Sequence, residues 1–157
     1  MEVTFAPRGI LQIDDARIIF RNFRGEGSAY NREGDRNFAV SIDSTELADE
    51  LVAEGWNVKI KDATEDGDLP RMHLPVKVKF SNKGPHVYLK TGNKVNELDE
   101  ESVGILDDID ILSVNLDIRP YDWEVNGKTG RAAYLQSIEV IQNIDRFAAG
   151  YDMQDEE

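Results

Sequence analysis

The sequence predicts a mainly β fold, a small barrel of short strands with one helix. Three observations carry this prediction. Apolar and polar residues alternate in several short segments, one segment has helical periodicity with start and stop signals, and an Asn-Gly turn joins two β-prone arms near the end. The 157 residues are enough for one domain with a hydrophobic core. We expect this domain to span residues 1–144, followed by an acidic tail at 145–157.

The first expected strands flank a polar loop. A β-prone run begins at Ile18 and leads into residues 25–35, which are rich in Gly, Asn and Ser and therefore favour a loop. Phe38, Val40 and Ile42 then alternate with other residues, which predicts a half-buried strand.

One segment carries the signals of a helix. Asp43 and Glu46 have the spacing of a capping box, so the helix is expected to begin there, and Gly55 ends it. Its apolar stripe consists of Leu47, Ala48, Leu51 and Val52.

The second half of the chain is expected to be mostly strands. The expected elements are strands at 56–60, 74–80 and 87–89, a short acidic helix at 99–106, a strand at 109–118, a hairpin, and a last strand that ends near 144. The hairpin turn is Asn126-Gly127, a pair that favours the positive φ angles of tight hairpins.

Short strands, one capped helix and a closing hairpin are typical of an OB-fold, a five-stranded Greek-key barrel that binds oligonucleotides across one face. In the usual OB-fold the helix follows the third strand. Here the helix comes earlier, so we expect an elaborated OB-like barrel.

The composition argues against an enzyme. There is no cysteine, and the only histidines are His73 and His86, so neither a thiolate nucleophile nor a histidine-based metal site is expected. No catalytic constellation or phosphate-binding loop is present, and we expect no metal and no cofactor. No apolar run reaches membrane-spanning length and no secretory signal is visible, so we expect a cytoplasmic protein that binds no membrane.

Charge is zoned along the chain, although the net charge is −13. Residues 71–94 hold six Lys or Arg and no acid, and residues 17–36 hold five Arg against three acids. Residues 95–117 hold eight acids and no base. We expect the two cation-rich segments to line one groove while the acids lie elsewhere. The alternative is a solvated acidic surface with chance local excesses of cations.

In these zones cations interleave with aromatic residues. That combination suits a single-stranded nucleic acid, because cations attract phosphates and unpaired bases stack on rings. Lys77 and Lys79 lie opposite the apolar face of their strand, so we expect them to reach solvent. In the hairpin we expect Tyr134 to stack on bases and Trp123 to pack in the core.

The candidate nucleic-acid-binding residues combine these cations and rings. They are Arg17, Arg21, Phe23, Arg24, Tyr30, Arg32, Arg36, Lys77, Lys79, Lys128, Arg131 and Tyr134. Core packing remains the alternative for Phe23.

Four stretches of the chain carry a resemblance. RIIFRNFRGEGSAYNREGDRNFAVSID (17–43), GWNVK (55–59), LDEESVGILDDIDI (98–111) and RPYDWEVNGKTGRAAYLQSIEV (119–140) resemble a group of small proteins of tailed phages and prophages. The hairpin and acidic tail are similar in outline to phage OB-fold single-stranded-DNA-binding proteins of the T7 type. Such tails commonly end in an aromatic residue, whereas this one ends Asp155-Glu156-Glu157, with Tyr151 further in.

The resemblance implies a sequence-tolerant single-stranded-DNA-binding protein of phage or prophage origin, active in replication or recombination in the bacterial cytoplasm. The acidic tail would dock replication or recombination proteins and compete with DNA for the cationic groove. Two alternatives stay open: an acidic interaction protein, such as a DNA mimic or inhibitor, and a structural phage component. The sequence also leaves a homodimer open.

Overall fold

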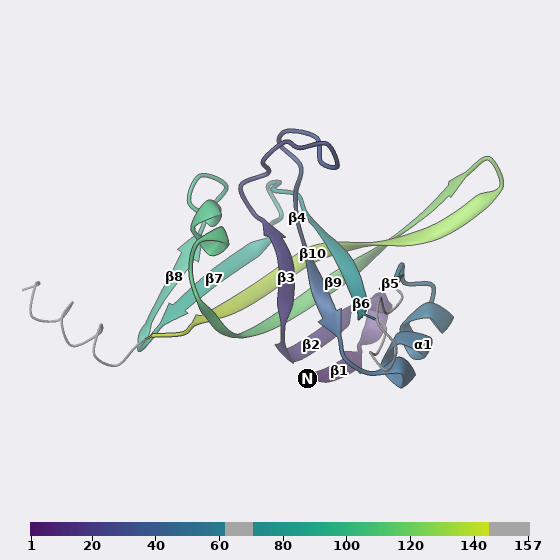
Figure 1. The fold of residues 1–157 in the computed structure, drawn as a ribbon, viewed down its shortest axis with the longest axis horizontal. Helices are drawn as coiled ribbons and strands as arrows, with labels where there is room; N and C mark the ends of the chain where they lie inside the picture. The colour runs from purple at the N-terminus through teal and green to yellow at the C-terminus, as the bar shows by residue number, and fades with distance from the viewer. Residues whose placement is uncertain (62–70, 145–157) are drawn as a thin grey trace, which may run out of the picture.

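A computed structural model describes residues 1–61 and 71–144. The elements are β1 (Glu2–Phe5), η1 (Pro7–Gly9), β2 (Leu11–Ala16), β3 (Ile18–Asn22), β4 (Arg36–Ile42), α1 (Thr45–Ala53), β5 (Lys59–Lys61), β6 (Arg71–Val78), β7 (His86–Thr91), β8 (Lys94–Leu98), η2 (Val103–Asp107), β9 (Ile111–Val125) and β10 (Lys128–Gln142). Figure 1 shows these strands wrapped into a small barrel, with the β9–β10 hairpin projecting from one side. The predicted fold class, mainly β with one helix, is confirmed. The expected acidic tail lies outside the described residues.

The barrel is closed through a bent segment of the chain. The strands are paired in the order β2-β9-β10-β6-β4-β3. Only Arg17 separates β2 from β3, and the chain bends near Asp15, which has a φ of 54°. One continuous segment therefore pairs with β9 at its beginning and with β4 at its end. The Ser41 N–H donates a hydrogen bond of 2.9 Å to the Arg17 carbonyl at this seam.

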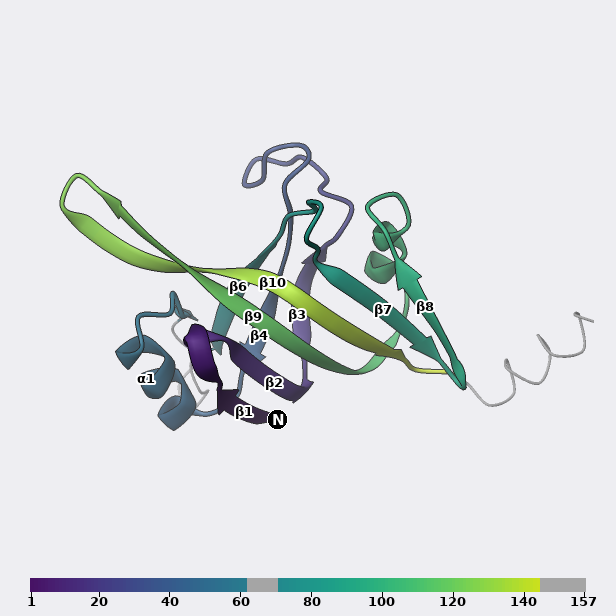
Figure 2. The same cartoon turned by 180° about the vertical axis from the view of Figure 1, so that it is seen from behind.

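This arrangement is the partly open Greek-key barrel of an OB-fold. The five barrel strands, in chain order, are the bent β2–β3 segment, β4, β6, β9 and β10. The β6–β10 pair is parallel and the other barrel pairs are antiparallel. Helix α1 lies between the second and third barrel strands, earlier than in the usual OB-fold, as expected. Strands β1, β5, β7 and β8 are the additions that elaborate the barrel (Figure 2).

The core is apolar and is built from strand alternation. Leu74 and Val76 of β6 are fully buried, as are Val114 and Ile118 of β9. Within the described residues, no polar or charged side chain is buried with them. Because one face of each strand fills the barrel, the opposite face must point to solvent or cover an added element.

Helix α1 follows the sequence signals with one correction. Its N-cap is Ser44 rather than Asp43, because the Ser44 hydroxyl accepts a hydrogen bond of 3.2 Å from the Leu47 N–H. At the other end Gly55 has a φ of 94°, and the Trp56 N–H donates to the Leu51 carbonyl at 3.0 Å. This is a Schellman ending, for which glycine is favoured.

Several element boundaries differ from the expectations. The two N-terminal strands and β8 were not predicted. The strand expected at 56–60 begins only at Lys59, because Trp56 is buried in the core and makes an isolated bridge with Arg131. The short helix expected at 99–106 is a 3-10 helix over 103–107, with Val103 and Leu106 fully buried as predicted. No helix of the described residues is long and apolar enough to cross a membrane.

The first prediction concerns Phe23, which has no exposed surface and stacks on Phe38 with the ring centroids 5.1 Å apart. We expect Phe23→Ala to lower the free energy of unfolding by about 3–5 kcal/mol, because it leaves a cavity in the core. Urea denaturation followed by circular dichroism measures this change. Tyr30→Ala is the matched control, since Tyr30 is fully exposed and its loss should change stability by less than about 0.5 kcal/mol. Equal effects of the two substitutions would contradict the core assignment.

Candidate nucleic-acid interface

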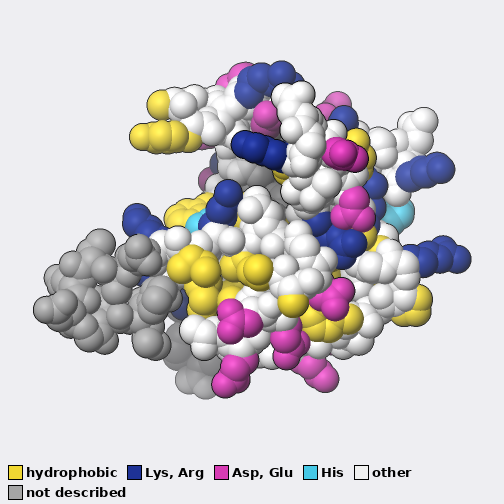
Figure 3. Space-filling view, turned by 90° about the vertical axis from the view of Figure 1, so that its right-hand side faces the viewer, with side chains coloured by type: hydrophobic (Ala, Val, Ile, Leu, Met, Phe, Trp, Pro, Cys, Tyr) yellow, Lys and Arg dark blue, Asp and Glu magenta, His cyan; other side chains and the backbone are white. Residues whose placement is uncertain are grey.

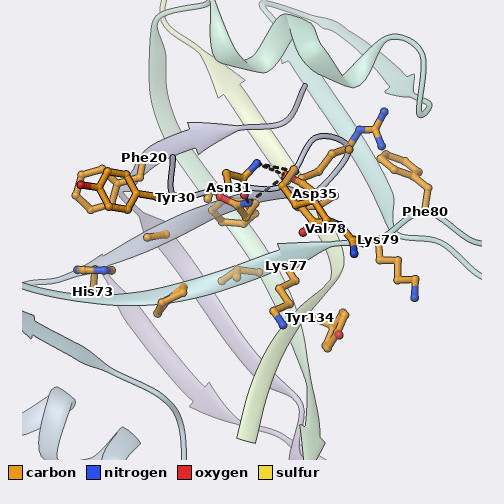
Figure 4. Close-up of a pocket in the computed structure, with 18 of the residues that line it drawn as sticks. Phe20, Tyr30, Asn31, Asp35, His73, Lys77, Val78, Lys79, Phe80 and Tyr134 are labelled. Atoms are coloured by element: carbon orange, nitrogen blue, oxygen red, sulfur yellow. Dashed lines mark hydrogen bonds and ion pairs between the residues drawn. The ribbon is translucent and has the colours of Figure 1, made fainter. Parts of the chain in front are cut away.

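A groove of about 710 Å³ runs over the outer face of β4 and β6. The loop at 25–35 overhangs one side of it, and Tyr134 of β10 lines it beside Lys77 (Figure 4). Figure 3 shows the molecule hollowed beneath this overhanging loop. We call this hollow the β6 groove. Its position corresponds to the face that OB-folds use for oligonucleotides, between the second and third strands.

The floor of the β6 groove is cationic because of the alternation of β6. Met72, Leu74, Val76 and Val78 are buried in the core. The alternate residues point outward, and they are Arg71, His73, Pro75, Lys77 and Lys79. No acid stands among them. Lys77 and Lys79 are exposed, as the sequence predicted.

Tyr134 lines the groove between two cations. It pairs with Lys77 in the parallel β10–β6 register. The Lys77 Nζ lies 5.8 Å from the centre of the Tyr134 ring, and the Arg119 guanidinium carbon lies 5.2 Å from it. Tyr121 meets the same ring edge-on at 5.8 Å. The half-buried Tyr134 thus lines the groove, and Arg119 and Tyr121 are neighbours that sequence reasoning missed.

Aromatic side chains also line the groove near His73. Phe20 is 68% exposed and Tyr30 is fully exposed, and both line the groove. His73 meets Phe20 edge-on, with the ring centroids 5.3 Å apart. Burial, followed by the charge of Lys59, lowers the pKa of His73 and favours a neutral imidazole at pH 7. Phe20 was not predicted as a site residue, because its φ of 53° turns it out of strand alternation.

The overhanging loop is held in shape by its own hydrogen bonds. The Asn31 side chain donates to the carbonyls of Glu26 at 2.8 Å and Asp35 at 3.0 Å. The Asn37 side chain donates to the Asn31 side-chain oxygen at 2.9 Å. These bonds tie the loop to the start of β4 and position Tyr30 at its tip. The loop is therefore an ordered wall of the groove.

Acids neutralise part of the arginine-rich segment, so the expectation that the acids lie elsewhere is wrong for residues 99–110. Arg24 is paired through two hydrogen bonds with Asp108, which lower the pKa of that carboxyl. Arg36 is paired with Glu100 at 3.2 Å. Arg21 donates to the carbonyls of Leu106 and Ile109, both at 2.7 Å. Arg21 and Arg24 thus anchor the η2 segment to β3 and lie outside the groove.

Two aromatic residues do not lie where the sequence placed them. Phe23 was a candidate for binding DNA, but it is buried in the core and cannot reach a ligand. Trp123 was expected in the core, but it is 40% exposed. Among the described residues, the part of β9 beyond Ile118 pairs with β10 alone, so the hairpin arms leave the barrel and Trp123 leaves with them.

The remaining candidates divide between the groove and the surfaces beside it. Arg32 and Arg36 line the groove together with Tyr30, Lys77, Lys79 and Tyr134. Arg17 lines a neighbouring hollow. Lys128 lies exposed next to the hairpin turn. Arg131 stands over the Trp56 ring and bonds Asp122 at 2.7 Å, which raises the pKa of Arg131.

The groove offers binding groups rather than reactive ones. Aromatic rings and cations line the groove together, and no nucleophile paired with a base stands among the residues that line it. In the part of the chain that the structure describes, no group of three or more His, Asp or Glu residues could hold a metal ion. The arrangement fits an extended anionic chain that carries flat, unpaired rings.

Solved structures of a phage protein share this fold. The chain is similar to the single-stranded DNA-binding protein from bacteriophage Enc34 in a C-terminal truncation, with 15% identity, a TM-score of 0.55 and 91% of each chain covered. The same Enc34 protein in complex with ssDNA gives 15% identity and a TM-score of 0.53, covering 92% of this chain and 93% of that one. A further structure of it gives 14% identity and a TM-score of 0.54, covering 94% and 89%. No curated protein matches the chain.

A family model described as "Putative phage ssDNA-binding domain" matches residues 2–153. This match spans almost the whole chain and agrees with the resemblance carried by the four stretches quoted from the sequence. The chain therefore belongs to the phage ssDNA-binding domain family.

Proposed function

We propose that this protein binds single-stranded DNA in the β6 groove with little sequence preference. The observation that carries the proposal is the outward face of β6, where Lys77 and Lys79 line the groove together with the aromatic side chains of Phe20, Tyr30 and Tyr134. Lys77, Lys79 and Arg32 would contact phosphates, and Phe20, Tyr30 and Tyr134 would stack on bases. Family membership supports the same ligand.

The geometry favours a single strand over a duplex. Stacking on Phe20 or Tyr30 requires a base whose face is free, and in a duplex that face is covered by the neighbouring pair. Each stacked base contributes about 1–3 kcal/mol, and every base has such a face, so binding should tolerate any sequence. A strand lying along β6 would present its phosphates to the lysines at the same time.

The acidic character of the whole protein fits this function because the charge is separated in space. Glu46, Asp49, Glu50 and Glu54 are exposed on or beside α1. In Figure 3 acidic side chains gather on the lower part of the face where α1 lies, away from the overhanging loop. A DNA mimic would need acids on the surface that its target recognises, whereas the outward face of β6 carries none.

The proposal extends to the biological role of the protein in the phage-infected host. We propose a non-catalytic protein of phage or prophage origin that acts in replication or recombination in the host cytoplasm. Its acidic tail at 145–157 would dock partner proteins and compete with DNA for the groove. The family is named for DNA binding, which supports the first step of this role.

The direct test compares single-stranded and duplex DNA. We expect fluorescence anisotropy at low salt to show micromolar or tighter binding to a labelled oligonucleotide, weaker binding to the same sequence as a duplex, and similar affinities for unrelated sequences. The log of the binding constant should fall with the log of the salt concentration, with a slope of about −0.7 per phosphate neutralised. No binding at micromolar protein, or tighter binding to duplex, would refute the proposal.

Reversing the charge of the groove floor should weaken binding. We expect Lys77→Glu with Lys79→Glu to reduce affinity for single-stranded DNA about tenfold or more at low salt and to make the salt slope shallower by about 1.4. Thermal unfolding should be nearly unchanged, because both side chains are exposed. The control is Arg8→Glu with Lys90→Glu, which makes the same charge change away from the groove. A control that loses as much affinity would point to net charge instead of the groove.

Removing the charge of Glu100, one of the two acids that line the groove, should have the opposite effect. Glu100 pairs with Arg36 and competes with phosphate for it. We expect Glu100→Gln to raise the affinity for single-stranded DNA about two- to fivefold at low salt, which corresponds to the energy of one exposed ion pair. The gain in affinity should shrink as the salt concentration rises. Glu101→Gln, one residue away, is the matched control and should change affinity less. Equal gains from the two variants would contradict the competition at Arg36.

A further inference from the structure

A second hollow continues the β6 groove toward β5. It has a volume of about 970 Å³, and Phe20 and His73 line both hollows, so the two meet at these rings. Its cations are Arg17, Lys61 and Arg71. We call it the basic hollow.

The pairing of β5 with β6 concentrates positive charge at the basic hollow. Lys61 stands directly opposite Arg71. Residues directly opposite in an antiparallel pair share one face of the sheet, and like charges in that position are destabilising. An anion bound between them would remove this repulsion. The arrangement therefore points to an anionic ligand.

The basic hollow lies in line with the groove floor. Arg71 and Lys79 are eight residues apart on one face of β6, which corresponds to about 26 Å of strand. Acids are also present, since Asp43 and Glu46 line the hollow from the start of α1. Among the described residues that line the hollow, three cations stand against these two acids. A single strand that follows β6 past Phe20 would thus meet Arg71 and its neighbours.

We propose that single-stranded DNA continues from the β6 groove across Phe20 into the basic hollow, where Arg17, Lys61 and Arg71 hold its phosphates. This inference rests on the proposed function and adds a second subsite to it. The β6 groove would hold a short strand by itself. The basic hollow would bind only the part of a longer strand that extends beyond the groove.

The test uses oligothymidines of two lengths with a variant of the basic hollow. Anisotropy at low salt would measure binding of dT4 and dT12 to the wild type, to Lys61→Gln with Arg71→Gln, and to the control Arg8→Gln with Lys90→Gln. We expect the hollow variant to bind dT4 within about twofold of the wild type. For dT12 we expect a loss of about fivefold or more and a salt slope shallower by about 1.4, because two phosphate contacts are gone.

A further variant and the comparison of dT4 with dT12 distinguish a second subsite from a loss of folding. Unchanged dT4 binding shows that the Gln variant is folded, and Lys61→Arg with Arg71→Lys, which keeps both charges, should restore dT12 binding. Equal losses for dT4 and dT12, or dT12 binding like that of the wild type, would overturn the second subsite while leaving the proposed function intact. Failure of the wild type to bind either oligonucleotide would overturn both.

Discussion

The alternation of side chains along β6 is the constraint on which both the core and the groove depend. Leu74 and Val76 fill the barrel, and Lys77 and Lys79 face solvent from the same strand. A slip of one residue would bury the lysines and expose the core residues, at a cost that no surface interaction could offset. Pairing with β4 and β5, together with the contact with β10 at Tyr134, fixes this register. The cationic floor is therefore as firmly placed as the core.

Charge has two separate uses in this molecule. Around η2, arginine and acid neutralise each other, since Arg24 pairs with Asp108 and Arg21 donates to two carbonyls. Those interactions attach a segment to the barrel and leave little charge for a ligand. Along β6 the cations face the groove, and the acids that line it are Asp35 and Glu100. Net charge along the sequence does not distinguish these uses, because pairing is decided by the fold.

Local signals in the sequence predicted local features well. The helix and its Gly55 ending follow from capping and αL preferences, and the outward lysines of β6 follow from unbroken alternation. Features that depend on distant parts of the chain were missed. Trp123 looked like a core residue, but no strand beyond β9 and β10 covers that part of the hairpin. Phe20 looked like part of a strand, but its positive φ turns its ring toward the groove.

The bent β2–β3 segment contributes both to the closure of the barrel against β4 and to the lining of the groove. The same stretch of backbone carries Leu11 and Ile13 into the core, supplies the Arg17 carbonyl that accepts the seam hydrogen bond from Ser41, and places Phe20 in the groove. A ligand that rests on Phe20 therefore holds the segment against β4. Binding and barrel closure are then linked equilibria, so an occupied groove would slow the opening of the barrel, and amide exchange at Ser41 would report occupancy from outside the groove itself.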